Sequence, residues 1–536
     1  MFRKRDPQAG LFETTNLLPQ QKRARLTETW AETFRQRALP LIQEDPFAPL
    51  FDEGNGRPNV PVQILVAVLI LKDMFNLTDD ETLEQVEFSL LWQHALRLAP
   101  EDAHVCQKTL HNFRTRLLAH DGGRLAFEQI TAAIIQALGI RVSRQRLDST
   151  HIVSNFAVLT RLGLFCETLR VALTALRRSH PKIYGRVPEE LRERYVKADG
   201  GETRFRDAKS DEARRRLDVC GRDAYRVLSV CEGKAAGKLK EVETLKRLFE
   251  EQCKLVEDDQ QPSDDDADSE QGGVPVVVKE PKDISSASLQ TPHDPDATYS
   301  GHKGKGYEVQ IAETCHAENE VEILTHVDVT PSFESDASAT IPVLNDLAER
   351  GLQPQELVAD TTYGSAENAV YAARLGTELV SPVSGSTPTE VAPAAAEDER
   401  TLTPADFTID LREQTALCPA GVPALSVEAV DERGKVVELR FDADKCVSCP
   451  FVGRCPAKLE AEGDATTVRV NLEKANLEQR RRAEARGELR PRYRIRAGIE
   501  ATNSELKRKH GLGRLRVRGR ARVALAVYFK ALACNV

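Results

Sequence analysis

The chain has 536 residues, of which 41% are hydrophobic and 29% are charged. This length accommodates two to four domains, and the composition excludes a disordered chain and an integral membrane protein. No apolar run reaches the length of a membrane span, and the N-terminus MFRKRDPQAG lacks the apolar core of a signal peptide. We therefore expect a cytoplasmic protein with no membrane partner.

The net charge of −9 averages two opposite regions. Residues 257–270 carry eight acids and no base, whereas residues 480–522 carry sixteen Lys or Arg against four Glu. Because salt screens the field of a charge within about 10 Å, the local charge of a segment decides what it binds, and the net charge of the chain does not. The basic stretch is a candidate for binding a polyanion.

Residues 1–140 are expected to be helical. An apolar helix over 60–75 is followed by a capping-box pattern, Thr78 with Glu81, which opens a second helix. A third helix over 107–120 combines an apolar stripe with a basic face. Such short helices suit a helix-turn-helix-like DNA reader, although a plain helical bundle with a solvated face fits equally well.

A strand is expected within RVSRQRLDSTHIVSNF (141–156), with Asp148 at or near its end. A helix-rich stretch follows to about residue 253. The acidic segment after it, rich in Ser, Asp, Pro and Gly, is expected to be a flexible linker.

Strand patterns resume at 293–315, where glycines punctuate a hairpin, and continue through VEILTHVDVTP. The helix ATIPVLNDLAER follows, with Gly351 at its C-terminal end, and then the short strand LVADTTYGS, which ends in Asp360. Alternating strands and helices indicate an α/β core. Residues 385–470 change to Pro/Ala/Thr-rich loops and short strands, which indicates an insert.

Four cysteines cluster in this insert with the spacing C-x27-C-x2-C-x5-C. Four thiolates at tetrahedral reach are what a structural Zn²⁺ requires. Unliganded reduced thiols, an iron–sulfur cluster or a disulfide are the alternatives. The candidate ligands are Cys418, Cys446, Cys449 and Cys455.

Five arginines follow at intervals of two in HGLGRLRVRGRARVAL. In an extended segment they point to one side, where they can follow a phosphate backbone, and we favour DNA binding over a merely solvated face. An apolar helix over VALAVYFKALACNV closes the chain. The arginines are Arg514, Arg516, Arg518, Arg520 and Arg522.

Before this run, YRIRAGIEATNSELK has the spacing Y-x2-R-x3-E-x6-K, formed by Tyr493, Arg496, Glu500 and Lys507. Offsets of 3, 4 and 7 residues return to one face of a helix. A carboxylate on that face can hold a divalent metal, while the cations and the hydroxyl bind phosphates. An exposed helix rich in Glu and Arg is the alternative.

Asp148, Asp360 and Glu500 form a candidate acidic triad. Acids at the carboxyl ends of neighbouring strands converge at one edge of an α/β sheet. Three carboxylates can hold two Mg²⁺ ions, which activate a nucleophile and stabilise the leaving oxygen at a phosphodiester.

The ordered set LDSTHI, GYEVQIAETC, LVADTTYGS and YRIRAGIEATNSELK resembles the DDE insertion-sequence transposases, which have a ribonuclease-H-like core. The Y-x2-R-x3-E-x6-K spacing is similar to that of the cut-and-paste group, and the helical N-terminal region also resembles the domain that precedes such cores. The resemblance implies that Asp148, Asp360 and Glu500 are the metal ligands, for two Mg²⁺ or Mn²⁺ ions. It also implies that Tyr493, Arg496 and Lys507 contact DNA. Glu505 is the rival for the third acid, but it breaks the spacing.

The resemblance implies a DNA transposase, which cuts at transposon ends and joins the freed 3′ ends to target DNA. Its partners would be double-stranded DNA, with terminal inverted repeats and target sequences, and a second copy in a homodimer on nucleoid DNA. A metal-dependent nuclease without strand transfer and a retired transposase that only binds DNA are the alternatives.

The expected fold is an α/β ribonuclease-H-like core with an all-α N-terminal domain and two inserts. The core is divided into three parts by a helical insert with its linker and by a cysteine-bearing insert. The segments are an N-terminal DNA-binding domain (1–140), core (141–164), helical insert (165–256), acidic linker (257–292), core (293–384), cysteine-bearing insert (385–475), and the catalytic helix with the basic segment (476–536).

Several neighbours of the triad have two interpretations. His151 orients a nucleophile, touches the metal or is structural, and Thr361, Thr362 and Tyr363 offer hydroxyls to DNA or shape a turn. Lys303 and Lys305 lie in a glycine-rich hairpin, where they either approach the DNA backbone or are solvated.

Overall fold

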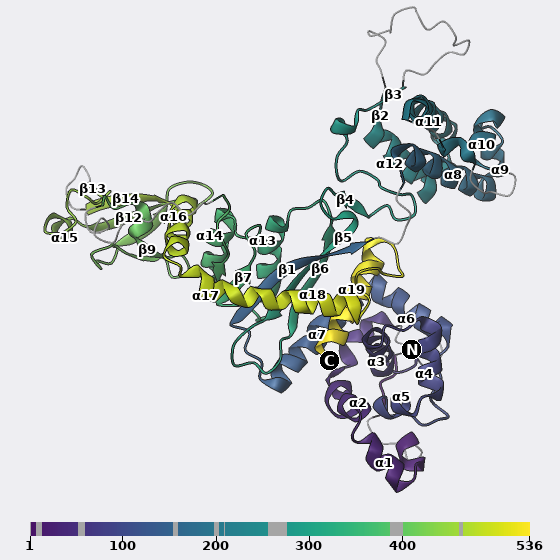
Figure 1. The fold of residues 1–536 in the computed structure, drawn as a ribbon, viewed down its shortest axis with the longest axis horizontal. Coiled ribbons are helices and arrows are strands. Elements are labelled where there is room, and N and C mark those ends of the chain that lie inside the picture. The colour runs from purple at the N-terminus through teal and green to yellow at the C-terminus, as the bar shows by residue number, and fades with distance from the viewer. Residues whose placement is uncertain are drawn as a thin grey trace, which may run out of the picture.

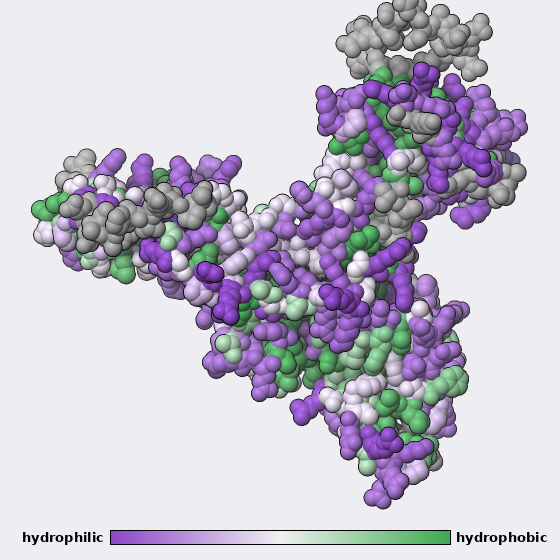
Figure 2. All heavy atoms as spheres, in the orientation of Figure 1, coloured by the Kyte–Doolittle hydropathy of each residue, from purple (hydrophilic) through white to green (hydrophobic). Residues whose placement is uncertain are grey.

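The computed structural model describes residues 2–6, 13–51, 59–153, 159–197, 203–207, 210–255, 276–385, 400–459 and 465–536. A central mixed sheet is joined to an N-terminal helical region, and two lobes project from it (Figure 1). In Figure 2 the visible face is mostly hydrophilic over the helical lobe, and hydrophobic residues gather toward the sheet and the N-terminal region. No helix among the described residues is long and apolar enough to cross a membrane.

The central sheet has six strands in the order β4-β5-β1-β7-β8, with β6 also paired to β5. Strand β5 is antiparallel to both of its neighbours β6 and β1, whereas β7 and β8 run parallel to β1. The expected strand in 141–156, the glycine hairpin and the strand before Asp360 are confirmed. The bounds are β1 (Arg144–Val153), β4 (Thr298–Ser300), β5 (Gly304–Thr314), β6 (Leu324–Pro331), β7 (Glu356–Ala359) and β8 (Glu378–Val380).

Helices cover both faces of this sheet, so its strands are buried on two sides. On one face, Leu147 and Leu357 pack with α13 (Thr340–Glu349) and α14 (Ala366–Leu375). On the other face, residues of β5 and β6 pack with α7 (Gly122–Leu138) and α19 (Arg520–Asn535). Helices on both faces of a mixed sheet are the α/β arrangement that the alternating pattern predicted.

The N-terminal region is helical, as expected. Helix α3 is buried along most of its length, and the capping box of Thr78 with Glu81 opens α4. Helix α6 buries Leu110, Phe113 and Leu117 and leaves basic side chains outside. The bounds are η1 (Thr14–Leu17), α1 (Gln20–Leu26), α2 (Trp30–Thr33), the π-helical η2 (Phe34–Ala38), η3 (Leu39–Leu41), η4 (Asp45–Leu50), α3 (Val62–Met74), α4 (Asp79–Phe88), α5 (Leu90–Ala95) and α6 (Gln107–Ala119).

The helical lobe lies between β1 and β4 in the chain and has its own apolar core. Residues 257–275 of the expected acidic linker lie outside the described residues; the linker's described end contains β3, paired with β2, and the buried Leu289. The bounds are α8 (Arg161–Ser179), α9 (Pro181–Tyr184), α10 (Glu189–Tyr195), η5 (Arg204–Arg206), α11 (Ser210–Cys231), η6 (Ala235–Lys238), α12 (Lys240–Gln252), β2 (Cys253–Leu255), β3 (Val276–Val278) and η7 (Pro281–Asp283).

The cysteine-bearing lobe is a four-stranded sheet with a separate hairpin and its own core. Helix α16 leads from it back to the central sheet, where α17, η11 and α18 follow (Figure 1). The bounds are η10 (Pro404–Asp406), β9 (Thr408–Asp410), β10 (Thr415–Leu417), β11 (Ser426–Ala429), β12 (Val436–Asp442), α15 (Ala443–Val447), β13 (Lys458–Leu459), β14 (Ala465–Asn471), α16 (Leu472–Ala485), α17 (Leu489–Tyr493), η11 (Arg494–Ala497) and α18 (Gly498–Arg508); η8 (Asp336–Ala339) precedes α13 in the core.

Candidate active site

Strand register places Asp148 beside Asp360. The parallel pairing of β1 with β7 ends at Leu147 opposite Ala359, so each aspartate is the next residue on its own strand. Asp360 directly follows β7, as expected, but the prediction that Asp148 lies at or near the end of its strand was wrong. It lies in the middle of β1, because antiparallel pairing with β5 continues to Val153 after β7 has ended.

Glu500 reaches the same place from α18, which crosses the sheet in front of β1 (Figure 1). The Arg496 guanidinium lies among the three acids, with its nitrogens 2.9 Å from Asp148 Oδ1, 3.9 Å from Asp360 Oδ2 and 3.8 Å from Glu500 Oε1. The Glu500 side chain is 70% exposed, whereas that of Asp148 is 14% exposed. One cation therefore touches all three members of the sequence-predicted triad.

The expected single helix is three successive segments. Tyr493 ends α17, Arg496 lies in the 3-10 turn η11, and Glu500 and Lys507 lie on α18. The tighter turn aims Arg496 inward at Asp148. The four residues are therefore not on one continuous helix, but they stay close together: Tyr493 lies near Arg496 and both aspartates, and Lys507 lines the same groove as Glu500. The Arg496 cation, which the resemblance assigned to DNA, is part of the acidic site.

Burial raises the pKa of Asp148, while the Arg496 charge opposes the shift and Asp360 adds to it. The second oxygen of Asp148 accepts a hydrogen bond from Asn503 Nδ2 at 3.1 Å. Asp360 Oδ1 accepts from the backbone N–H of Thr362 at 2.7 Å. Both aspartates are thus oriented by donors, as a metal-binding carboxylate must be.

A buried ion pair beneath α18 holds that helix in position on the sheet. Arg146 Nε lies 2.6 Å from Glu313 Oε1, and the two side chains are 7% and 1% exposed. The Arg146 guanidinium also donates to the carbonyl of Ile495, and Thr502 donates to Glu313 Oε2 at 2.7 Å. The sheet therefore holds both η11 and α18 by hydrogen bonds.

Gly498 is where this helix meets Arg146 most closely. A Cβ atom there would lie 2.0 Å from Arg146 Nη1. Gly→Ala in a helix ordinarily stabilises by up to about 1 kcal/mol. Here we expect Gly498→Ala to destabilise the core by about 1–3 kcal/mol, because the buried guanidinium must move. The unfolding temperatures of the natural chain and of Gly498→Ala measure this loss of stability.

Gly185→Ala is the matched control. Its backbone is also α-helical and an added Cβ meets nothing closer than 3.5 Å. An unchanged or raised unfolding temperature for Gly498→Ala would contradict the close contact.

An open groove of about 500 Å³ adjoins Glu500. Within it, Glu308 Oε1 lies 2.6 Å from Lys303 Nζ, and Glu308 Oε2 lies 3.3 Å from His151 Nδ1. Glu308 and Asn503 were missed from the sequence, although the helical offset of three from Glu500 pointed to Asn503. The groove is lined by Ser149, Thr150, His151, Lys303, Glu308, Glu500, Asn503, Ser504, Lys507 and Arg508.

The remaining neighbours divide by burial. Tyr363 is fully buried and its hydroxyl donates to Gln310 Oε1 at 2.7 Å, so it is structural. Thr361 and Thr362 are at least partly exposed in the turn after Asp360. Lys305 donates to the carbonyl of Leu159, on the side of the helical lobe.

The five arginines of the C-terminal run are all exposed. The extended geometry expected for them is not found: the chain bends at Arg514 and Arg516, and Arg520 and Arg522 lie in the first turn of α19. Burial still alternates, because Leu515 is buried between exposed arginines. Arg514, Arg516 and Arg522 line a cavity of about 410 Å³ together with Lys72 and Arg114 of the N-terminal region. Cations from both ends of the chain therefore meet at one surface.

The four clustered cysteines carry free thiols. The Cys418 sulfur accepts the backbone N–H of Val422 at 3.3 Å, and burial followed by the three neighbouring thiols raises the pKa of Cys455. Cys446 lies in α15, and Cys449 and Cys455 in the loop after it. No three of these sulfurs form a metal-ligand group among the residues that the structure describes.

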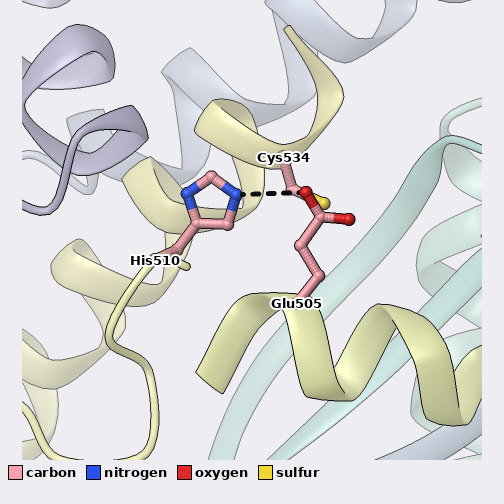
Figure 3. A group of neighbouring side chains, drawn as sticks. All are labelled: Glu505, His510 and Cys534. Carbon is pink, nitrogen blue, oxygen red and sulfur yellow. Dashed lines mark ion pairs between the residues drawn. The ribbon is translucent and has the colours of Figure 1, made fainter. Parts of the chain in front are cut away.

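Glu505, the rival third acid, points elsewhere. It lies 2.8 Å from Lys509 Nζ and faces His510 and Cys534 (Figure 3). The geometry therefore favours Glu500 as the partner of the two aspartates.

Two family models match the chain. The first, described as Transposase DDE domain, matches residues 417–536, which include Glu500 and the cysteine cluster. The second, described as Transposase domain (DUF772), matches residues 16–116 in the helical N-terminal region. No curated protein and no solved structure shows significant similarity to the chain. Both family models, at opposite ends of the chain, are of transposases, and together they indicate a DDE-type insertion-sequence transposase.

Proposed function

We propose that the protein cuts DNA at the ends of a transposable element and joins the freed 3′ ends to target DNA. The observation that carries this proposal is the convergence of Asp148, Asp360 and Glu500 on Arg496. Support for a ribonuclease-H-like core comes from the sheet, in which three antiparallel strands are followed by two parallel ones.

The donor set fits a hard divalent metal. Three carboxylates surround the Arg496 guanidinium, and oxygen ligands are those that Mg²⁺ and Mn²⁺ prefer. With Arg496 between them, their oxygens do not all lie within 4.8 Å of one another in the described part of the chain, so the acids would close around the metal once Arg496 turns away. Asp148, Asp360 and Glu500 would hold two such ions. When bound, these ions stabilise charge on the phosphodiester oxygens and lower the pKa of water.

The protein's own groups orient these acids and the DNA. Arg496 and Asn503 hold Asp148, and the Thr362 N–H holds Asp360. We assign Arg496 two roles: it keeps the acids together before metal enters, and it then turns toward a DNA phosphate. Tyr493 and Lys507 flank it on the same chain segment and bind neighbouring phosphates.

The DNA duplex would lie along the exposed arginines and the basic face of the N-terminal region, with two copies of the chain on paired ends. His111 of α6 lines the same cavity as these arginines, and Lys108, three residues before it, is exposed on the same helix. A structural Zn²⁺ on Cys418, Cys446, Cys449 and Cys455 would need these sulfurs to draw closer together, because no three of them lie at ligand spacing among the described residues.

The test of function uses duplexes that carry the DNA flanking the coding sequence, incubated with the full chain and Mg²⁺ or Mn²⁺. New 3′-hydroxyl ends together with joined products support transposition. Cleavage without joining indicates a nuclease, and binding with neither product indicates a retired transposase. The last two results overturn the proposal.

The arginine run gives a separate prediction for binding. The combined variant Arg514→Gln, Arg516→Gln and Arg518→Gln is expected to weaken DNA binding about 10- to 100-fold near physiological salt. The slope of log affinity against log salt should fall by about 2 to 3, because each lost phosphate contact removes about 0.9. Fluorescence anisotropy at several salt concentrations measures both quantities.

The control removes three exposed cations from the helical lobe instead: Arg178→Gln, Lys182→Gln and Arg186→Gln. An equal loss of slope in both combined variants would show that the effect follows net charge, not the arginine run.

A further inference from the structure

A second cluster of ligand-type side chains lies behind the acidic site, where α18, the loop after it and α19 meet. Glu505 on α18, His510 in the loop and Cys534 near the end of α19 each offer one ligand atom, and these atoms lie within 4.8 Å of one another (Figure 3). It is the one such group of three among the residues that the structure describes. None of the three contacts Asp148 or Asp360 in the interactions of the acidic site.

The histidine gives an independent reason to expect a ligand. His510 is fully buried, and its Nδ1 lies 3.1 Å from the carbonyl oxygen of Asp73. A carbonyl only accepts, so Nδ1 carries the hydrogen and the neutral ring has a lone pair on Nε2. That Nε2 is buried, has no hydrogen-bond partner and lies 3.8 Å from Glu505 Oε1.

A buried lone pair that faces a carboxylate is unfavourable unless a cation lies between them. A tetrahedral ion with bonds of about 2.0–2.3 Å holds its ligands about 3.3–3.8 Å apart. The 3.8 Å separation between His510 Nε2 and Glu505 Oε1 already fits this spacing. The half-buried, free thiol of Cys534 supplies the third ligand.

We propose that Glu505, His510 and Cys534 form a binding site for one Zn²⁺ ion, distinct from the acidic site. Sulfur and nitrogen ligands select a borderline-soft ion over Mg²⁺, and the exposed side of Glu505 leaves a fourth position for water. Binding converts the Cys534 thiol to a thiolate and releases its proton to solvent. The Zn²⁺ keeps its oxidation state.

The ion would join three parts of the chain. It would tie α18, which carries Glu500, to α19, and through His510 to α3, whose Asp73 also bonds Lys530 at 2.8 Å. Lys509 is the competitor, because its ammonium lies 2.8 Å from Glu505 Oε1. Its side chain is 60% exposed and can turn to solvent.

The test measures metal on the full, reduced chain after chelation and reloading with Zn²⁺ or Co²⁺. Glu505→Gln, an exposed change that is safe for folding, and Cys534→Ser are each expected to lose about one equivalent of metal per chain. Cys534→Ser should also lose cobalt–thiolate absorption. The exposed Cys106→Ser is the matched control and should keep both.

Two further results separate this site from the four-cysteine cluster and from a simple ion pair. Lys509→Met should bind Zn²⁺ a few-fold more tightly, because the competing ammonium is gone. Chelation should lower the unfolding temperature of the natural chain more than that of Cys534→Ser. Unchanged metal content in both Glu505→Gln and Cys534→Ser overturns the proposal.

Discussion

Glu500→Gln is expected to lower metal-dependent DNA cleavage by more than about 100-fold. Losing groups that only orient a metal ligand already costs about 10- to 100-fold, and Glu500 would be a ligand itself. The change is nearly isosteric, and the side chain is 70% exposed, so folding should be unaffected. Cleavage rates on end-containing duplexes over a Mg²⁺ titration measure the loss.

A DNA-binding measurement distinguishes a loss of catalysis in Glu500→Gln from a general loss of folding or of DNA binding. Glu500→Gln should bind end DNA at least as tightly as the natural chain, because one negative charge near the phosphates is removed. Asp148→Asn and Asp360→Asn should behave alike, since the three acids act on the same metals. The exposed Glu488→Gln, which loses only a surface pairing with Arg486, is the matched control and should cleave normally.

One result would contradict the assignment of Glu500 as the third acid. If Glu505→Gln abolishes cleavage while Glu500→Gln retains it, the third acid is Glu505 and the Y-x2-R-x3-E-x6-K spacing has misled the assignment. The structure argues otherwise, because Arg496 joins Glu500 to the two aspartates while Glu505 faces Lys509.

The acids of this site could be proposed from the sequence because each lies in a recognisable local pattern. Asp360 follows a short apolar strand, and Glu500 has fixed offsets from an aromatic residue and two cations. Their meeting could not be derived, because it depends on pairing β1 with β7, more than 200 residues apart. Asp148 was misplaced on its strand for the same reason: a local pattern does not show where each neighbouring strand stops.

Other residues of the site could not be predicted from the sequence, because their positions contradict the usual sequence patterns. Arg146 and Glu313 are charged residues inside strands, which sequence patterns assign to solvent, yet both are buried and paired. Arg496 was expected on one continuous helix in contact with DNA, but it lies in a 3-10 turn with its guanidinium 2.9 Å from Asp148 Oδ1. A turn of that kind is decided by contacts with the sheet, here the Arg146 bond to Ile495, and not by local propensity.

The buried pair of Arg146 and Glu313 carries the second large prediction. Glu313→Gln is expected to lower the free energy of unfolding of the core by about 3–5 kcal/mol, because it leaves the Arg146 charge buried without a counter-charge. Faster hydrogen exchange of β1, β5 and α18 amides measures the effect locally, which avoids assuming one transition for several domains. Glu438→Gln, which breaks an exposed pair with Arg469, should cost at most about 1 kcal/mol.

A double variant distinguishes the contribution of this pair to the stability of the core from its role in positioning α18. Arg146→Met with Glu313→Leu replaces the pair by apolar side chains of similar size, which often restores stability. It cannot restore the hydrogen bonds to Ile495 and Thr502 that set α18 above the sheet. We therefore expect near-natural protection from exchange in β1 and β5, with DNA cleavage still reduced about 10-fold or more because Glu500 is less well placed. Full recovery of cleavage in the double variant would mean that the pair serves the stability of the core alone.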